Sequence, residues 1–314
     1  MTPGVRAPLK IVDEILPLGY LEGLTINSRT LHGMTTSSLS CMKLLASWGL
    51  IKNTRNCDKC NVQMSFQERC TAYVDGFVWR CKFCSKIDSV RKGSFFQGSH
   101  LEFYKLIDII YLWSNRTSIG EAKRESGVSI GPLIDWYNFI RGICANCLND
   151  HPVQMGGPGM VVEIDEREFM RPKNSKGLRK EGHWVLGMAE RGTNSCALVV
   201  VEDRTSLLLI IREHVLPKTI IITHGWSAYN RLKDEYCHDV VDHTLHFLDP
   251  RDPGAEVHAN TVLGNWAHFK SKFQKMHGTN YSLFESYVQE FVWRKNFADN
   301  NVFGNILYWI RHYY

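Results

Sequence analysis

Two pairs of closely spaced cysteines constrain the fold of this chain more than any other feature of its sequence. Cys57 and Cys60 form one Cys-x-x-Cys pair, and Cys81 and Cys84 form another after twenty intervening residues. Zn²⁺ takes four thiolate ligands in a tetrahedron at about 2.3 Å, and two such pairs supply them. Because a module of this size has little core, a bound metal would provide much of its stability. The spacing predicts a zinc ribbon with a structural zinc ion; unliganded thiols are the alternative.

The residues around these pairs add detail to that prediction. Residues 72–80 predict a β-hairpin, because an Asp-Gly step lies between two short apolar runs. Cys70 falls outside both pairs, and we expect it to be a buried thiol. Cys144 and Cys147 form a third pair at helical spacing, which favours core thiols over a second metal site.

The 10 cysteines also indicate whether the protein works in a reducing or an oxidising compartment. Metal-type spacing favours a reducing environment over a disulfide framework. Residues 1–30 contain no apolar run of signal-peptide length, and the most apolar segments are too short to cross a bilayer. We therefore expect an intracellular protein without a membrane partner. A formal net charge of +5 permits nucleic-acid binding without establishing it.

Basic and aromatic side chains alternate around the second cysteine pair. Cations neutralise phosphates and aromatic rings contact bases, so this mixture favours contact with nucleic acid. A solvated basic face over a small core is the alternative. The cations are Lys82, Lys86, Arg91 and Lys92, and the interleaved rings are Trp79, Phe83, Phe95 and Phe96.

The middle of the chain predicts helices. Residues 37–48 and 101–113 carry helical periodicity. Residues 117–121 contain a capping box that predicts a helix near 118–125, followed by a Gly-containing turn and a third helix that ends near residue 148. This is the plan of a helix-turn-helix. A plain helical linker is the alternative, because the third helix is not unusually basic.

The second half of the chain predicts an α/β fold. Three strand-like runs are followed by alternating helices and strands, which indicates a mixed sheet flanked by helices. The predicted strands are 160–165, 183–190, 196–202, 219–223 and 238–242, and the predicted helices are 205–214, 226–234, 260–276 and 282–294.

Three segments of this half have the layout of a metal-dependent nuclease. Residues 161–166 form an apolar strand that reaches Asp165, residues 220–226 form a strand that ends at His224, and residues 258–266 begin a helix. Enzymes that cleave and transfer DNA strands hold two Mg²⁺ ions among carboxylates. Such carboxylates usually project from strand ends and a neighbouring helix, as these segments do.

Further motifs occur in a fixed order over about residues 40–300. They are 90–96, 162–166, 182–187, 225–229, 242–243, 247–250, 258–261 with Trp266 and Lys270, and 287–294. Together with the cysteine pairs, they resemble the Merlin group of DDE transposases and their bacterial insertion-sequence relatives. The resemblance implies an RNase H-like catalytic domain behind a zinc ribbon and a helical DNA-binding segment. It also implies DNA as the partner, self-association and a nuclear location.

The chain departs from this family at two of three catalytic positions. Asp165 matches the first acid, but His224 and Leu263 stand where the second and third acids are expected. Histidine is a poorer magnesium ligand than a carboxylate, and leucine cannot ligate. We therefore expect a transposase-derived DNA-binding protein that is impaired in DNA cleavage and strand transfer. Magnesium would be required only in an active enzyme.

Other interpretations remain open. An active transposase could use rearranged ligands, and a decayed or protein-interaction derivative would need none. His224 could be a structural histidine, or could bind a transition metal together with Asp165. Candidate replacement acids near the site are Glu166, Asp203, Asp242, Asp249 and Glu256.

A basic loop follows the first strand. Its cations alternate with Pro and Gly, which predicts a flexible loop along a DNA backbone, with a solvated loop as the alternative. The cations are Arg171, Lys173, Lys176, Arg179 and Lys180.

These features predict five regions along the chain. They are an N-terminal helical region (1–52), a zinc ribbon (53–98), a helical segment that is either a helix-turn-helix or a linker (99–150), an RNase H-like domain (151–300) and a C-terminal tail (301–314).

Overall fold

The computed structural model divides the chain into two compact units. The first unit comprises Met1–Ile143 and Asn300–Tyr314, and the second comprises Cys144–Asp299. The structure describes residues 8–69, 73–169, 182–201, 206–224, 227–241, 260–275, 280–298 and 300–314. No helix in those ranges is long and apolar enough to cross a membrane.

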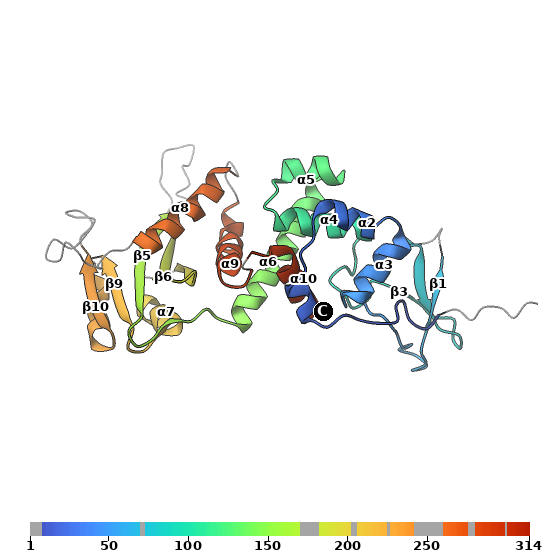
Figure 1. Cartoon of the computed structure of the whole chain (residues 1–314), viewed down its shortest axis with the longest axis horizontal. Helices are drawn as coiled ribbons and strands as arrows, with labels where there is room; N and C mark the ends of the chain where they lie inside the picture. The colour runs from blue at the N-terminus through green and yellow to red at the C-terminus, as the bar shows by residue number, and fades with distance from the viewer. Residues whose placement is uncertain are drawn as a thin grey trace, which may run out of the picture. The chain divides into compact units, whose positions relative to one another are not determined.

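The second unit is built on a five-stranded mixed sheet in the order β10-β9-β5-β6-β7. Its strands are β5 (Val161–Phe169), β6 (His183–Glu190), β7 (Cys196–Val201), β9 (Ile220–His224) and β10 (Cys237–Val241). Strands β5, β6 and β7 pair antiparallel, whereas β9 runs parallel to β5, and β10 parallel to β9. Figure 1 shows β10, β9, β5 and β6 side by side. The predicted α/β mixed sheet of RNase H-like type is confirmed.

The connections of this sheet follow from its pairing. A parallel strand needs a crossover, and the chain passes through α7 (Leu207–His214) between β7 and β9. A 3-10 helix, η2 (Ser227–Asp234), links β9 to β10 where the sequence predicts an ordinary helix. A small parallel pair, β4 (Met155–Gly156) and β8 (Val215–Leu216), lies outside the main sheet.

Helices cover the sheet closely. Six consecutive residues of β6, 185–190, are buried, so both faces of the sheet are covered. Helix α8 (Asn260–Lys275) lies on the face of Gly187, where any side chain would collide with the Trp266 ring. Helix α9 (Phe284–Asn296) packs against β7. The aromatic cluster between these elements includes Phe169, Trp266, Phe269 and Phe284.

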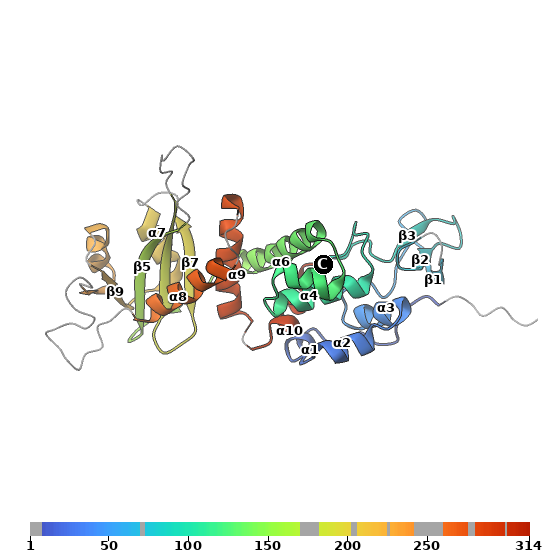
Figure 2. The ribbon, with the colours of Figure 1, turned by 90° about the horizontal axis from the view of Figure 1, so that it is seen from above.

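The first unit combines a small sheet with helices. Strands β1 (Ser65–Glu68), β2 (Phe77–Arg80) and β3 (Ile87–Ser89) form an antiparallel sheet with β2 in the centre, and Figure 2 shows them together. The helices are α1 (Gly19–Glu22), α2 (Ser28–Met34), α3 (Ser38–Ser47), α4 (Phe103–Ser114), α5 (Ile119–Ser126) and α10 (Val302–Tyr313). Helix α6 (Ile130–Asp150) continues past residue 143 into the second unit.

The predicted hairpin at 72–80 is wrong in its first arm. Strand β2 pairs with β1 and β3, and not with residues 73–74. Asp75 is instead held by Arg91, and Gly76 has a φ of 72°, so the Asp-Gly step leads into β2 without closing a hairpin on itself. Cys70 lies outside the described residues.

The last residues form a helix where the sequence suggests a tail. Phe303, Ile306, Leu307 and Ile310 are buried along one side of α10, which contacts α1 and α4. The spacing of these side chains is that of an amphipathic helix. Residues 301–314 therefore complete the core of the first unit.

Helices α5 and α6 have the local features of the predicted helix-turn-helix. Ser118 and Glu121 form the expected capping box at the start of α5, and Gly127 ends that helix with a φ of 66°. Ile130 and Ile134 are exposed on the first turns of α6. The choice between a helix-turn-helix and a linker stays a prediction.

Candidate functional site

The four paired cysteines come together in the first unit. One ligand atom from each of Cys57, Cys60, Cys81 and Cys84 lies within 4.8 Å of the others. The sulfur atoms of Cys57 and Cys84 are 3.5 Å apart. A tetrahedron with Zn–S bonds of about 2.3 Å has sulfur atoms about 3.8 Å apart. The cluster can therefore hold a metal such as zinc.

Each cysteine pair sits in the same type of backbone turn. We call residues 57–62 the first knuckle and residues 81–86 the second knuckle. The amide of Cys57 donates to the carbonyl of Val62 at 2.9 Å, and the amide of Cys81 donates to that of Lys86 at 2.8 Å. The residue after each second cysteine is left-handed, with a φ of 51° at Asn61 and 58° at Ser85. The two knuckles thus have the same backbone conformation, and each directs its two cysteines to the cluster.

The environment favours ionisation of one thiol. A backbone hydrogen bond from Lys86 is the largest influence that lowers the pKa of Cys84 to about 7. The hydrogen bond between Cys60 and Cys84 raises the pKa of Cys60 to about 12. A metal binds thiolates, so the lowered pKa of Cys84 favours metal binding at this cluster.

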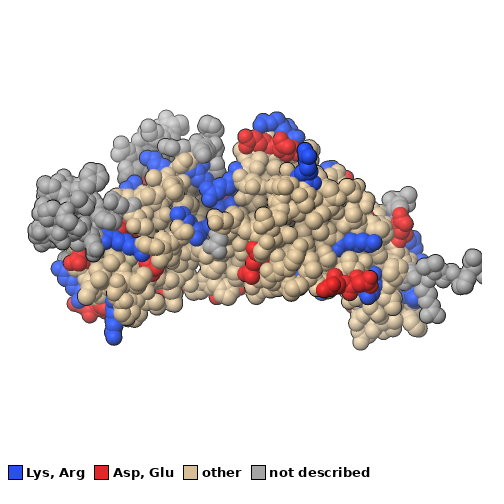
Figure 3. All heavy atoms as spheres, in the orientation of Figure 1, with Lys and Arg blue, Asp and Glu red and all other residues tan. Residues whose placement is uncertain are grey.

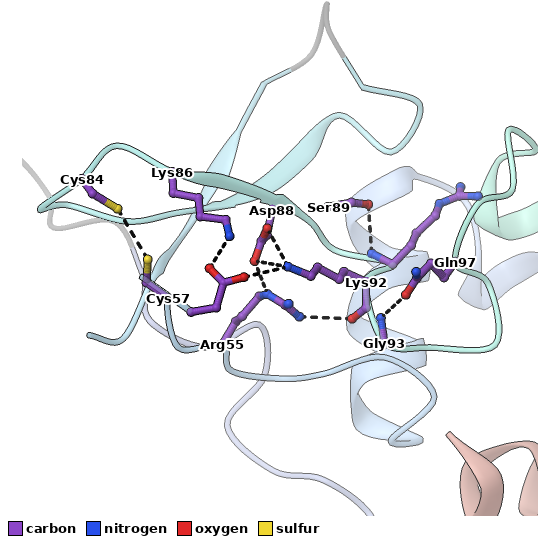
Figure 4. Close-up of polar contacts among 11 residues, drawn as sticks. Arg55, Cys57, Cys84, Lys86, Asp88, Ser89, Lys92, Gly93 and Gln97 are labelled. Carbon is purple, nitrogen blue, oxygen red and sulfur yellow. Dashed lines mark hydrogen bonds and ion pairs between the residues drawn. The ribbon is translucent and has the colours of Figure 1, made fainter. Parts of the chain in front are cut away.

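Two lysines predicted to contact nucleic acid form ion pairs beside the cluster (Figure 4). Lys86 pairs with Asp58, and the Lys92 ammonium lies 3.3 Å from Asp58 and 3.1 Å from Asp88. The hydrogen bond from Lys86 lowers the pKa of Asp58 to about 2. Burial alone would raise the pKa of Asp88, but hydrogen bonds from Arg55 and Lys92 hold it below its usual value. These lysines therefore neutralise acids of the module.

The structure places Arg91 away from solvent. Its side chain is 4% exposed and makes two hydrogen bonds to Asp75, of 2.7 and 2.6 Å, and further bonds to the carbonyls of Ser99 and Leu101. The guanidinium also lies 4.4 Å from the ring centre of Phe103. These four bonds direct the guanidinium into the protein, and the predicted contact of Arg91 with nucleic acid stays a prediction.

The interleaved aromatic residues also differ in exposure. Trp79, Phe95 and Phe96 are buried, whereas Phe83 is 77% exposed, and Lys82 beside it is exposed as well. On the face in Figure 3, the Lys and Arg side chains that are described lie scattered among Asp and Glu and form no continuous basic band. The basic loop with Arg171, Lys173, Lys176, Arg179 and Lys180 lies outside the described residues.

The three predicted catalytic positions belong to neighbouring elements of the second unit, and we call them the strand-end site. Ile164 of β5 pairs with Thr223 of the parallel strand β9. The next residue on each strand is Asp165 and His224, so the two positions are neighbours on adjacent strands, halfway along β5 and at the end of β9. Leu263 lies in the first turn of α8, which contacts β5. The Asp165 carboxylate is 3.3 Å from Arg167, and its side chain is 16% exposed.

A buried acid missing from the sequence-based predictions fixes this geometry. Glu163 is 0% exposed and accepts hydrogen bonds from the amides of Thr261, at 2.7 Å, and Val262, at 3.0 Å. Its other oxygen lies 3.2 Å from the Thr261 hydroxyl and 2.7 Å from Arg191. A carboxylate at a helix N-terminus satisfies free amides and the helix dipole. Glu163 therefore docks the start of α8 onto β5.

Glu163 and Glu166 lie on opposite faces of β5, because side chains alternate along a strand. Glu163 shares the face of Asp165, whereas Glu166 interacts with Tyr229 of η2. Burial raises the pKa of Tyr229, and the nearby Glu166 carboxylate raises it further. Glu166 is thus directed away from Asp165 and does not replace a missing ligand beside it.

A two-magnesium site is not formed by the residues that the structure describes. Within those ranges, the cysteine cluster is the one group of three or more Cys, His, Asp or Glu side chains that is close enough to hold a metal. The side chain of His224 is not described, and Asp203, Asp242, Asp249 and Glu256 lie outside the described residues. Asp165 alone does not fit the carboxylate-rich site that two Mg²⁺ ions need.

Comparison with known proteins agrees with this architecture. The ISXO2-like transposase domain matches residues 156–296, a range that contains the whole five-stranded sheet. An uncharacterized transposase-like protein of Haemophilus influenzae is 34% identical over 92 residues, which cover 29% of this chain and 71% of that protein. The chain therefore belongs to a transposase family.

A second relative is a nematode protein. The male abnormal protein mab-31 of Caenorhabditis elegans is 29% identical over 187 residues, which cover 52% of this chain. The matched region spans 44% of mab-31, so less than half of that protein has a counterpart here.

Proposed function

We propose that this chain is a transposase-derived DNA-binding protein of the Merlin type in which DNA cleavage and strand transfer are impaired. One observation carries the proposal. Positions 165 and 224 lie on the adjacent strands β5 and β9, position 263 lies in the first turn of α8, which contacts β5, and only the first of the three holds a carboxylate.

Charge explains why this combination impairs catalysis. Two Mg²⁺ ions carry four positive charges, and Asp165 offsets one of them. A neutral histidine adds no negative charge, and Leu263 packs against the hydrophobic core of the unit. The dications would therefore be poorly neutralised in a partly buried site.

The rest of the fold is suited to holding DNA without cutting it. Zinc at the four cysteines would stabilise the ribbon, and Lys82 is exposed beside them. Lys86 and Lys92 add positive charge, although both also pair with acids. The family resemblance supports DNA as the partner, self-association and a nuclear location.

A cleavage assay on supercoiled plasmid tests the proposal. Wild-type chain and the double variant His224→Asp/Leu263→Glu are compared with Mg²⁺ or Mn²⁺. We expect no nicking by wild type, and metal-dependent nicking by the double variant that disappears when Asp165→Ala is added. Cleavage by wild type that Asp165→Ala abolishes would instead establish an active transposase with rearranged ligands.

DNA binding separates the remaining alternatives. Attraction to phosphates releases counterions, so DNA affinity should fall steeply as salt rises. Absence of DNA binding at low salt would favour a protein-interaction or decayed derivative over the proposed function.

A further inference from the structure

Phe83 is an aromatic side chain that is exposed and does not pack in the core of the fold. Among the large hydrophobic residues that the structure describes, it is the most exposed, at 77%. It lies in the second knuckle between Lys82 and Cys84, where a turn closed by a backbone hydrogen bond holds it. Its ring contributes almost nothing to the core.

The first knuckle shows that this position does not require a ring. The two knuckles have matching hydrogen bonds and matching left-handed residues, so Lys59 and Phe83 occupy equivalent places between their cysteines. Lys59 is exposed in the same way. The turn therefore accepts a solvated cation, and the phenyl ring at the second knuckle needs another explanation.

Some of the lysines around the two knuckles form ion pairs and others do not. Lys86 and Lys92 neutralise Asp58 and Asp88. In the described part of the chain, Lys59 and Lys82 are exposed and form no ion pair. Because all four cysteines converge on one site, the two knuckles lie next to each other. The surface at their tips thus presents one ring and two available ammonium groups.

We propose that Phe83 stacks on an unpaired base of DNA while Lys59 and Lys82 contact the flanking phosphates. Aromatic rings on a positively charged surface bind single strands in this way, because every base has a flat face. In duplex DNA the bases are already stacked, so the ring has no partner there. A turn fixed by metal-binding cysteines also limits the conformational entropy lost on binding. This inference rests on the proposed DNA binding.

The test measures binding of the full zinc-loaded chain to labelled oligothymidylate of about 15 nucleotides, a length suited to single-strand sites. A duplex of equal length is measured beside it by fluorescence anisotropy. We expect Phe83→Ala to weaken single-strand binding about tenfold, and duplex binding less than about twofold. Phe83→Tyr should bind like wild type, whereas Phe83→Leu should bind like Phe83→Ala.

The matched control is Leu209→Ala, which removes another highly exposed apolar side chain, 63% exposed on α7. It should leave both affinities unchanged. Zinc content is measured for every variant, and if Phe83→Ala loses zinc, the Tyr and Leu variants decide the result. Equal binding by those two would overturn the stacking role.

Other outcomes separate this inference from the proposed function. Duplex binding that persists while Phe83→Ala leaves single-strand affinity unchanged overturns the stacking role alone. An equal loss for both DNA forms also overturns it, since it points to a general effect on the surface. A wild-type chain that binds neither DNA form removes the proposed function and this inference together.

Discussion

The four-cysteine cluster of the first unit and the strand-end site of the second both assemble side chains from separate segments of the chain. The cluster has four thiols within 4.8 Å of one another, which could hold a metal ion. At the strand-end site, the elements are in place and Glu163 docks α8, but Asp165 is the one carboxylate at the three positions.

The difference follows from what each set of ligands does for folding. A structural metal supplies stability to a module with little core, so loss of one ligand affects the whole module. Clustered catalytic acids repel one another and are costly to bury, so a histidine or leucine in their place need not destabilise the fold. A chain can therefore keep its scaffold when such acids are replaced.

Removal of metal should have the largest effect. Structural zinc contributes about 10 kcal/mol or more to folding in small zinc modules. We expect chelation, or Cys81→Ser, to abolish hydrogen-exchange protection in β1–β3 while the sheet of the second unit stays protected. Cys237→Ser is the control, because Cys237 is an exposed free cysteine outside the cluster. Unchanged protection after Cys81→Ser would show that the cluster is not a metal site.

Loss of the Glu163 carboxylate, which docks α8 onto β5, should have the second-largest effect on stability. Glu163→Ala leaves Arg191 and two helix amides without their partner, and breaking such a buried pair costs about 3–5 kcal/mol. Urea denaturation of the second unit measures this cost, and exchange of the Thr261 and Val262 amides reports the site itself. Substitution of the exposed Glu213 by Ala should cost under about 0.5 kcal/mol. Equal stabilities for the two variants would contradict the docking role.

Arg91 distinguishes a structural cation from a DNA-binding one. We expect Arg91→Lys to destabilise the first unit by about 2 kcal/mol, because lysine cannot reproduce the two-point contact with Asp75. Lys82→Gln should leave stability unchanged and weaken DNA binding at low salt. Thermal unfolding and anisotropy measure the two properties. The reverse pattern would restore Arg91 as a DNA contact.

The smallest effect concerns pH in the second unit. Burial lowers the pKa of His238, whose ring nitrogen lies 2.8 Å from the Thr223 hydroxyl. A histidine with a lowered folded pKa stabilises the fold above its unfolded pKa of about 6.5, and this contribution is lost as pH falls below that value. We expect His238→Gln to flatten the fall in stability between about pH 7 and 5, a range set by the ordinary histidine pKa. Parallel urea curves of wild type and variant over this range would argue against it.

Much of the fold could be predicted because the relevant patterns are local. The spacing of the cysteines predicts their cluster, and strand-like apolar runs predict all five strands of the main sheet. The capping box at Ser118 and Glu121 is formed as expected. The match of residues 156–296 to the ISXO2-like transposase domain agrees with the resemblance to transposases that the order of the motifs indicates.

What the sequence left undetermined depends on partners far along the chain. The strand that pairs with β2 comes from residues 65–68, which the sequence did not indicate. The C-terminal helix α10 packs against α1, at the other end of the chain. Arg91 and Glu163 resemble surface charges in the sequence, yet both are buried by contacts to distant residues. The sequence by itself determined the five strands of the main sheet and the four cysteines that come together, since these follow from local pattern and spacing. Only the tertiary structure decided which charges are buried and which ring remains exposed, because burial depends on how distant segments pack.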